Sequence, residues 1–254
     1  MKLLASDYDG TLRYELKVVE EDLDAVKRWQ NAGNLFVVVT GRSMESFLQE
    51  LENNDFHCDF IVLNNGGVVY DGSGKCLQVS YLDFDKALEL IEYIRTLPCA
   101  SYVLNDGFHR HRVVIDPSQE DVKYANMPQE KDEEALLNGG KIAQIVISLN
   151  DDELAQRIVR YVNEQFNGYI EAYANRNCVD IVPVGISKAE GLSYVLQYLG
   201  IDDDNVYTIG DSFNDLPMIE AYHGFSVGMA PEEIREKSEQ VYLSVADCIE
   251  DLMR

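Results

Sequence analysis

The sequence has few cysteines, and none of them lies in a paired pattern. Its 254 residues contain five cysteines, an odd number, scattered along the chain without any C-x-x-C pair. A disulfide framework or a zinc site needs patterned cysteines, so neither is expected, and reduced thiols indicate a cytoplasmic protein. Long apolar runs are also missing. No segment approaches the ~20 apolar residues of a membrane span, and MKLLASDYDG has too short an apolar run for a signal peptide.

Basic residues are scarce as well. Lys and Arg together number 21, against 45 Asp and Glu, which gives a formal net charge of −24. A surface this acidic repels polyanions, so nucleic acids and anionic membranes are poor candidate partners. A small phosphorylated substrate remains compatible, because it would respond to the local field of a metal ion and a lysine. At 254 residues the chain can bury a large core and form one elaborated domain or two modest ones. We expect a monomer or a homodimer.

Two aspartates directly after an apolar run dominate the start of the chain. Leu3 to Ala5 predicts a buried strand, and Asp7 and Asp9, spaced i, i+2, follow it before a Gly-Thr turn. Alternate side chains of an extended segment share a face, so the two carboxylates should point the same way and repel each other. Mg²⁺ prefers such oxygen ligands, and with phosphate present one carboxylate can attack phosphorus while the other moves a proton. Alternatively, the aspartates merely end the strand in a turn, and this stretch alone does not decide.

The N-terminal third has the alternating strands and helices of a doubly wound α/β sheet. Continuous apolar runs predict parallel strands buried on both faces, and apolar residues at helical spacing predict the helices between them. Ligands bind such sheets outside the carboxyl ends of the strands, where Thr40-Gly41-Arg42 and Asn64-Asn65-Gly66 lie. The expected strands are 3–5, 35–39 and 60–63, and the expected helices are 20–32 and a second one capped by Ser43.

Residues 82–183 have a different pattern, in which short predicted strands and helices are mixed. This pattern predicts an inserted α+β domain. Residues 1–81 and 184–254 would then form one Rossmann-like core. In the insert we expect helices 85–97 and 152–166, a polar stretch 118–140, and strands 101–105, 112–115, 142–149, 169–174 and 179–182. In the second core segment we expect helices 187–199 and 245–253 and strands 206–209, 225–227 and 241–243.

Four features fall at predicted strand ends or helix starts of this core. They are the Asp7/Asp9 pair, Thr40-Gly41-Arg42, Lys188, and the segment from Gly210-Asp211 to Asp215. Lys188 is unusual, because a cation in the first turn of a helix opposes the helix dipole. In this order the four features resemble the haloacid dehalogenase-like superfamily, whose members mostly transfer phosphoryl groups through an aspartyl-phosphate. The position of the insert is similar to the type IIB cap of Cof-type sugar-phosphate phosphatases, and Asn65-Gly66-Gly67 resembles their NGA turn with Gly in place of Ala.

The resemblance implies a role for each matched residue. Asp7 matches the nucleophile, and Asp9 matches the general acid/base, whose backbone carbonyl is also expected on magnesium. Thr40, helped by the Gly41 amide, matches the group that hydrogen-bonds the transferring phosphoryl, and Lys188 matches the cation of the third motif. The implied Mg²⁺ ligands are Asp7, Asp9, Asp211 and Asp215, and the implied phosphate or substrate contacts are Gly10, Gly41, Arg42, Asn65 and Asn214.

Several of these residues also have plainer interpretations. Thr40 could simply end a strand, Lys188 could be a solvated surface lysine, and Asp215 could cap the helix that begins near Leu216-Pro217. In the insert, His109 and His111 could face the substrate or form an ordinary surface pair on a strand.

The predicted function is a magnesium-dependent phosphatase for a small phosphorylated metabolite such as a sugar phosphate, with the insert reading the leaving group. A phosphomutase, which returns the phosphoryl group to the substrate, is the first alternative. A response-regulator-like switch also uses a strand-end Asp, a Thr and a Lys, but it has no insertion of about 100 residues. A non-catalytic metabolite-binding protein is disfavoured, because every expected catalytic residue type is present.

Overall fold

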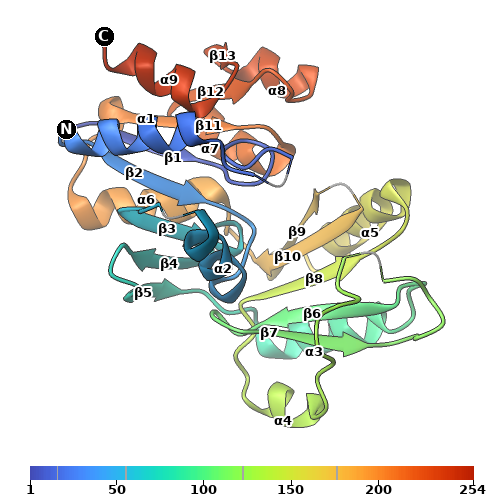
Figure 1. Ribbon diagram of the computed structural model, residues 1–254. Helices are drawn as coiled ribbons and strands as arrows, with labels where there is room; N and C mark the ends of the chain where they lie inside the picture. The colour runs from blue at the N-terminus through green and yellow to red at the C-terminus, as the bar shows by residue number, and fades with distance from the viewer. Residues whose placement is uncertain (16, 55, 122, 176) are drawn as a thin grey trace. The chain divides into compact units, whose positions relative to one another are not determined.

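The chain leaves one folded unit and later returns to it, in a computed structural model that describes residues 1–15, 17–54, 56–121, 123–175 and 177–254 (Figure 1). The first unit comprises Met1–Arg42, Phe47–Gln78 and Ser187–Arg254, and the second comprises Ser43–Ser46 and Val79–Ile186. The long inserted segment therefore comprises residues 79–186, whereas the sequence analysis expected an insert at 82–183. Each unit is built on a sheet of its own.

Within the described residues, the sheet of the first unit has eight strands in the order β13-β12-β11-β1-β2-β3-β4-β5. β1 is parallel to both of its neighbours, β11 and β2, and the pairing stays parallel as far as β13 on one side and β3 on the other. β4 pairs antiparallel with β3. The strands are β1 Leu3–Ser6, β2 Leu35–Val39, β3 Phe60–Leu63, β4 Val68–Asp71, β5 Cys76–Val79, β11 Val206–Gly210, β12 His223–Val227 and β13 Gln240–Tyr242. The carboxyl ends of β1, β2, β3 and β11 consequently share one edge of the sheet.

Helices cover this sheet because its buried strands are apolar on both faces. Leu3 and Ala5 pack in one cluster with Leu192 of α6 and Met218 of α7, and Leu4 points to the opposite face. α1 and α9 contact each other. The helices are α1 Glu20–Asn31, α2 Met44–Asn54, α6 Lys188–Leu199, α7 Leu216–Ala221, α8 Glu232–Lys237 and α9 Val245–Leu252. The parallel sheet and its helices confirm the predicted fold class, and none of the described helices is long and apolar enough to cross a membrane.

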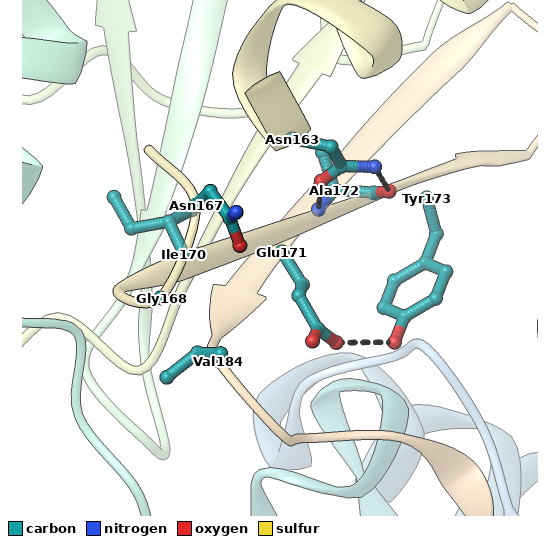
Figure 2. A pocket seen from close by; sticks show the side chains of 8 residues that line it. All are labelled: Asn163, Asn167, Gly168, Ile170, Glu171, Ala172, Tyr173 and Val184. Carbon is teal, nitrogen blue, oxygen red and sulfur yellow. Dashed lines mark hydrogen bonds between the residues drawn. The ribbon is translucent and has the colours of Figure 1, made fainter. Parts of the chain in front are cut away.

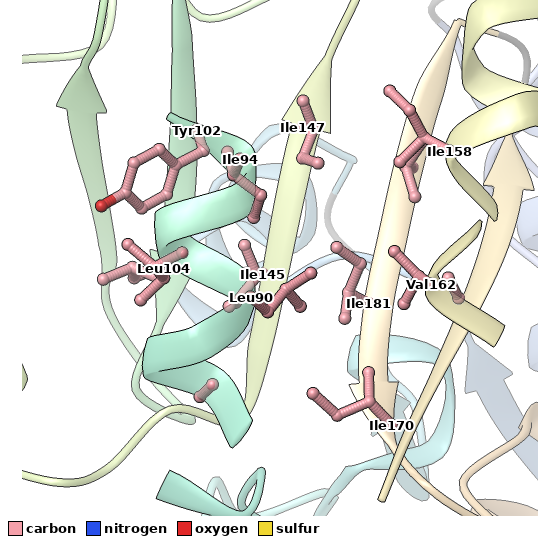
Figure 3. Close-up of a cluster of buried hydrophobic side chains, with 14 of the residues drawn as sticks. Leu90, Ile94, Tyr102, Leu104, Ile145, Ile147, Ile158, Val162, Ile170 and Ile181 are labelled. Atoms are coloured by element: carbon pink, nitrogen blue, oxygen red, sulfur yellow. The ribbon is translucent and has the colours of Figure 1, made fainter. Parts of the chain in front are cut away.

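The second unit has a five-stranded antiparallel sheet in the order β7-β6-β8-β10-β9. α3 and α5 supply one hydrophobic core, in which Leu90 and Val162 pack with Ile145 of the sheet (Figure 3). On the other face, Val103 and Val146 pack in a smaller cluster. The elements are α3 Phe84–Ile94, β6 Ser101–Asn105, β7 Arg110–Val114, α4 Glu133–Asn138, β8 Gln144–Ser148, α5 Asp152–Gln165, β9 Ile170–Asn175 and β10 Cys178–Pro183.

Some elements go beyond the sequence-based expectations. β4 and β5 extend the sheet past β3, and α8 follows β12. β5 has no fully buried residue and α8 buries only Ile234, so neither segment has the apolar pattern that identifies an element in a sequence. β7 begins at Arg110, two residues before the expected 112, and the polar stretch 118–140 contains only α4 as a regular element among its described residues.

Candidate active site

A buried lysine lies at the centre of the candidate site. Lys188 is the first residue of α6 and is 1% exposed, and its Nζ lies 2.5 Å from Asp7 Oδ1 and 2.5 Å from Asp215 Oδ1. An ammonium group is costly to bury unless it is paired, and these two carboxylates pair it. Burial acts to lower the pKa of Lys188, but the charges of Asp215 and Asp7 outweigh it and raise the pKa, so the side chain stays cationic. The interpretation of Lys188 as a solvated surface lysine is therefore wrong.

Asp7 is held at the end of β1 by the neighbouring strand. Its amide donates a 2.9 Å hydrogen bond to Ile209 O of β11, and its side chain is buried beside Lys188. Burial raises the pKa of Asp7 well above its usual value; the Lys188 ammonium opposes this shift, and the nearby Asp215 and Asp211 carboxylates reinforce it. The site therefore carries more negative charge than one lysine can compensate.

The turn after β11 fixes the second carboxylate that binds Lys188. Asp215 Oδ2 accepts hydrogen bonds from the amides of Asp211 (3.0 Å) and Ser212 (2.9 Å). Ser212 and Asp215 also form a reciprocal capping box around the short 3₁₀ turn Phe213–Asp215. Asp215 thus caps this turn and not α7, contrary to the interpretation of it as the cap of the helix near Leu216.

Three carboxylates gather closely enough to share a cation. Asp7, Asp211 and Asp215 each offer an oxygen atom, and these atoms lie within 4.8 Å of one another. Asp7 Oδ2 is buried without a hydrogen-bond partner, as expected of an atom that faces a ligand. Gly10 has a φ of +102°, and a Cβ at this position would lie 2.4 Å from Asp211 Oδ2, so glycine leaves room for that carboxylate. An all-oxygen, anionic donor set of this kind fits a hard divalent cation.

Two further turns join this edge of the sheet. The carbonyl of Thr40, at the end of β2, accepts a 3.1 Å hydrogen bond from the Asn65 amide, and Asn65 Oδ1 accepts a 3.0 Å bond from Asn214 Nδ2. Gly66, with a φ of +111°, brings the turn against the start of α6, because a Cβ there would lie 1.9 Å from Ser187 O. The turns after β2, β3 and β11 are therefore connected, and the candidate residues Thr40, Asn65 and Asn214 lie together.

Asp9 lies outside the three-carboxylate cluster, and two arginines hold its side chain. Arg42 Nε and Nη2 bind Asp9 Oδ2 and Oδ1 at 2.5 and 2.8 Å, and Arg13 Nη1 binds Oδ1 at 3.0 Å. Partial burial acts to raise the pKa of Asp9, but the hydrogen bonds and charges of Arg42 and Arg13 outweigh it and lower the pKa. Arg42 also binds Glu50, at 2.9 Å. Sequence analysis missed Arg13 and Glu50, because a pairing between charged residues leaves no periodic signal.

In the second unit, the polar residues that could face a substrate have partners within that unit. His111 Nδ1 lies 2.9 Å from Glu130 Oε2, and Arg112 Nη2 lies 2.8 Å from Asp121 Oδ2. His109, next to them in sequence, is exposed and stacks edge-on against Phe108. Of the candidate histidines, His109 therefore has the more accessible ring.

The second unit also contains a cavity of about 220 Å³ at the edge strand β9 (Figure 2). Three of its polar side chains bind one another or the backbone: Tyr173 donates to Glu171 Oε2 at 2.8 Å, and Asn163 exchanges hydrogen bonds with the backbone of Ala172. None of the sequence-predicted site residues lines this cavity. It is therefore not a candidate for the phosphoryl-transfer chemistry.

Comparisons with known proteins agree with this geometry. Residues 4–248 match the family described as haloacid dehalogenase-like hydrolase, so the chain belongs to this family. The chain is 24% identical to the 5-amino-6-(5-phospho-D-ribitylamino)uracil phosphatase YwtE of Bacillus subtilis, over 94% of this chain and 91% of that protein. A HAD/COF-like hydrolase from Plasmodium vivax superposes with a TM-score of 0.84 at 24% identity, covering 100% of this chain and 95% of that one. The subclass IIB sugar phosphatase BT4131 superposes with a TM-score of 0.81 at 17% identity, covering 100% and 98%. These matches confirm the predicted family and enzyme class, a haloacid dehalogenase-like phosphatase.

Proposed function

We propose that this protein is a magnesium-dependent phosphatase that hydrolyses a small phosphorylated metabolite through an aspartyl-phosphate on Asp7. The observation that carries the proposal is the buried Lys188 held between Asp7 and Asp215, beside a carboxylate oxygen of Asp7 that has no hydrogen-bond partner. This arrangement places one buried positive charge directly beside a fixed carboxylate. Phosphoryl transfer depends mainly on such positioning and charge neutralisation.

Asp7, Asp211 and Asp215 are the side chains that would hold Mg²⁺, with the backbone carbonyl of Asp9 as a further ligand. When bound, the ion would neutralise negative charge on the phosphoryl oxygens. Lys188 adds a second positive charge beside Asp7. The Thr40 hydroxyl and the Gly41 amide would hydrogen-bond the phosphoryl group, and the other proposed contacts to phosphate or substrate are Gly10, Arg42, Asn65 and Asn214.

The reaction would proceed in two in-line displacements. In the first, Asp7 attacks phosphorus, the ester P–O bond breaks, and Asp9 gives a proton to the departing alcohol. In the second, Asp9 takes a proton from water, which attacks the aspartyl-phosphate, releases inorganic phosphate and restores the Asp7 carboxylate. One residue thus serves as acid and then as base.

The substrate class is proposed from the division of the chain and from its relatives. The relative from Bacillus subtilis is named for a phosphorylated ribitylamino-uracil, and BT4131 is named a sugar phosphatase, so both names refer to small organic phosphates. We assign substrate selection to residues 82–183 and the chemistry to 1–81 and 184–254. We further propose a cytoplasmic monomer or homodimer without a nucleic-acid or membrane partner, consistent with the net charge of −24.

A panel of phosphorylated metabolites, assayed for released phosphate with Mg²⁺ and with EDTA, tests the proposal. We expect Mg²⁺-dependent release from at least one alkyl phosphate, and no release by the Asp7→Asn variant, whose amide is nearly isosteric but is not an anionic nucleophile. Formation of an isomeric sugar phosphate without free phosphate would instead identify a phosphomutase. Full activity of Asp7→Asn, with deamidation ruled out, would remove Asp7 from the nucleophile role.

A further inference from the structure

A second charged network lies beside the acidic cluster, and it joins Asp9 and Arg42 to Glu50 and Arg13, two residues that the phosphatase chemistry described so far does not use. Glu50, on α2, forms ion pairs with both arginines that hold Asp9. Its Oε1 accepts a 2.9 Å hydrogen bond from Arg42 Nη1, and its Oε2 lies 3.2 Å from Arg13 Nε without the alignment of a hydrogen bond. Tyr8, between Asp7 and Asp9 in the chain, donates a 3.0 Å hydrogen bond to the same Oε2. Each oxygen of Glu50 is therefore bound to a group that flanks Asp9.

The side chains of this network become more buried from Asp9 to Glu50. The side chain of Asp9 is 43% exposed, whereas those of Arg42, Arg13 and Glu50 are 19%, 17% and 14% exposed. Two arginines and two carboxylates balance in charge, so the network is neutral as a whole. Removing the negative charge of Glu50 would leave both arginines paired with Asp9 alone, and their charges already favour the ionised carboxylate, which cannot donate a proton.

Packing gives the network a rigid base. The guanidinium of Arg42 lies over the ring of Tyr8, 5.2 Å from its centroid, and this ring is fully buried, edge-on against Phe47 of α2. Burial first, and then the Glu50 charge and hydrogen bond, raise the pKa of Tyr8, so its hydroxyl remains a donor to Glu50. Arg42 is thus fixed on one side by an aromatic face and on the other by two carboxylates.

We propose that Glu50 is a positioning residue for catalysis, which fixes Asp9 through Arg42 and Arg13 so that Asp9 can serve the leaving group. The proposal rests on the proposed function, because it takes Asp9 as the acid of the first step. Glu50 itself contacts no reacting atom. Glu50 instead keeps the two arginines in a fixed position relative to Asp9. This matters because a small misplacement of a catalytic group strongly lowers the reaction rate.

The dependence on the leaving group separates this role from a structural one. An alkyl alcohol is a poor leaving group and needs a proton from Asp9, whereas p-nitrophenolate leaves without one. A displaced Asp9 should therefore slow the first step for glucose 6-phosphate and glycerol 3-phosphate, but not for p-nitrophenyl phosphate. The constant kcat/KM reports this step, because it covers everything up to departure of the alcohol.

The experiment compares kcat/KM for these three esters in the parent and in Glu50→Gln, alone and combined with Asp9→Asn. General acid catalysis is worth ~10²–10⁴-fold, so partial displacement of Asp9 should lower the alkyl-to-aryl ratio about 10-fold in Glu50→Gln. In the Asp9→Asn background the ratio should fall no further, because the acid is already absent. Glu50→Asp, which keeps the charge, should restore part of the ratio.

Glu250→Gln is the matched control, since Glu250 forms an exposed ion pair with Arg28 at 3.3 Å in the same unit, and it should leave the ratio unchanged. Circular dichroism and thermal melting check that each variant is folded. Three results would each overturn the inference. The first is an equal loss of kcat/KM for all three esters in folded Glu50→Gln, and the second is an unchanged alkyl-to-aryl ratio. The third is an equal further fall of this ratio in the Asp9→Asn background. Any alkyl phosphate of the metabolite panel that the parent cleaves can replace the two alkyl esters. If the parent cleaves no ester of the panel, the proposed function itself fails and the inference with it, whereas an unchanged ratio in an active parent overturns the inference alone.

Discussion

At the scale of single residues, charge imbalance is the defining property of the site. Three carboxylates, Asp7, Asp211 and Asp215, gather around the single ammonium of Lys188, so two negative charges remain uncompensated. Burial, with the neighbouring carboxylate charges as a smaller cause, raises the pKa of Asp7 and of Asp211. A bound divalent cation would remove the charge imbalance, which links metal binding directly to the stability of the fold.

We therefore expect Mg²⁺ to raise the melting temperature of the parent protein. At about 100 times its Kd, a ligand that binds only the folded state adds about 2.7 kcal/mol of stability, which corresponds to several degrees for a chain of this size. Asp211→Asn removes one of the three carboxylates, so its Mg²⁺-induced shift should be much smaller. Differential scanning calorimetry with Mg²⁺ and with EDTA measures both shifts. Equal shifts in the two proteins would place the ion elsewhere.

Substitution of Lys188 should have other effects than substitution of a metal ligand. Lys188→Met keeps an unbranched side chain of similar length but leaves two buried carboxylates without their cation, so it should lower the stability by about 3–5 kcal/mol. Because the phosphoryl group is common to all substrates, kcat/KM should fall ~100-fold or more, and by a similar factor for each of them. Urea unfolding and a substrate panel provide the measurements. A change of preference among substrates at an unchanged overall rate would contradict the assignment.

At the scale of elements, the sequence predicts those helices and strands that bury a regular pattern of apolar residues. The runs that form β2 and β3 are buried apart from the half-buried Leu35, and both strands were expected with their observed bounds, as was the start of α6 after Ser187. β5 and α8 bury too little apolar surface to produce such a pattern. The same limit applies to the site: strand ends indicate Asp7 and Thr40, but the pairing of Glu50 with Arg13 joins residues that no local pattern connects.

The contact between α1 and α9 contains a carboxylate that should make stability depend on pH. Asp22 of α1 is 4% exposed, and its Oδ1 accepts a 2.7 Å hydrogen bond from the Ala246 amide at the start of α9. Burial raises the pKa of Asp22 from 3.8 to about 6, although the Ala246 hydrogen bond opposes the shift. The folded state then binds the proton more tightly than the unfolded state, so this contribution to stability is full below pH 3.8 and is lost as the pH rises to about 6.

Asp22→Asn removes this titration. Between pH 5 and pH 7.5 the parent should lose about 1 kcal/mol more stability than the variant, beyond any constant offset from the substitution. Urea unfolding of both proteins at the two pH values gives the difference. Glu250→Gln, a change on α9 that leaves the surroundings of Asp22 intact, serves as the control and should titrate like the parent. A constant offset between parent and Asp22→Asn at both pH values would show that Asp22 has an ordinary pKa.

At the scale of the whole molecule, the residues assigned to the reaction and the long inserted segment occupy separate parts of the chain. Every residue assigned to the reaction or the metal lies at or before Asn65, or at or after Lys188. The long part of the second unit, residues 79–186, lies between them, and its short part, Ser43–Ser46, contains none of these residues. The phosphoryl group is shared by all candidate substrates, so the first unit alone has little basis for choosing among phosphate esters. Discrimination requires polar contacts to the leaving group, which can be worth several kcal/mol when their loss leaves a buried partner unpaired.

We therefore predict that changes at exposed polar positions of the second unit reorder the substrates while Mg²⁺ dependence persists. His109 is the best position, because its ring is exposed whereas His111 and Arg112 are bound to Glu130 and Asp121. Loss of one neutral hydrogen bond should change the ratio of kcat/KM between two metabolites by about 10-fold in His109→Ala. His57→Ala, an exposed histidine of the first unit, is the matched control and should preserve the ranking. If His57→Ala reordered the substrate panel and His109→Ala did not, selection would belong to the first unit, and the proposed division of labour would be wrong.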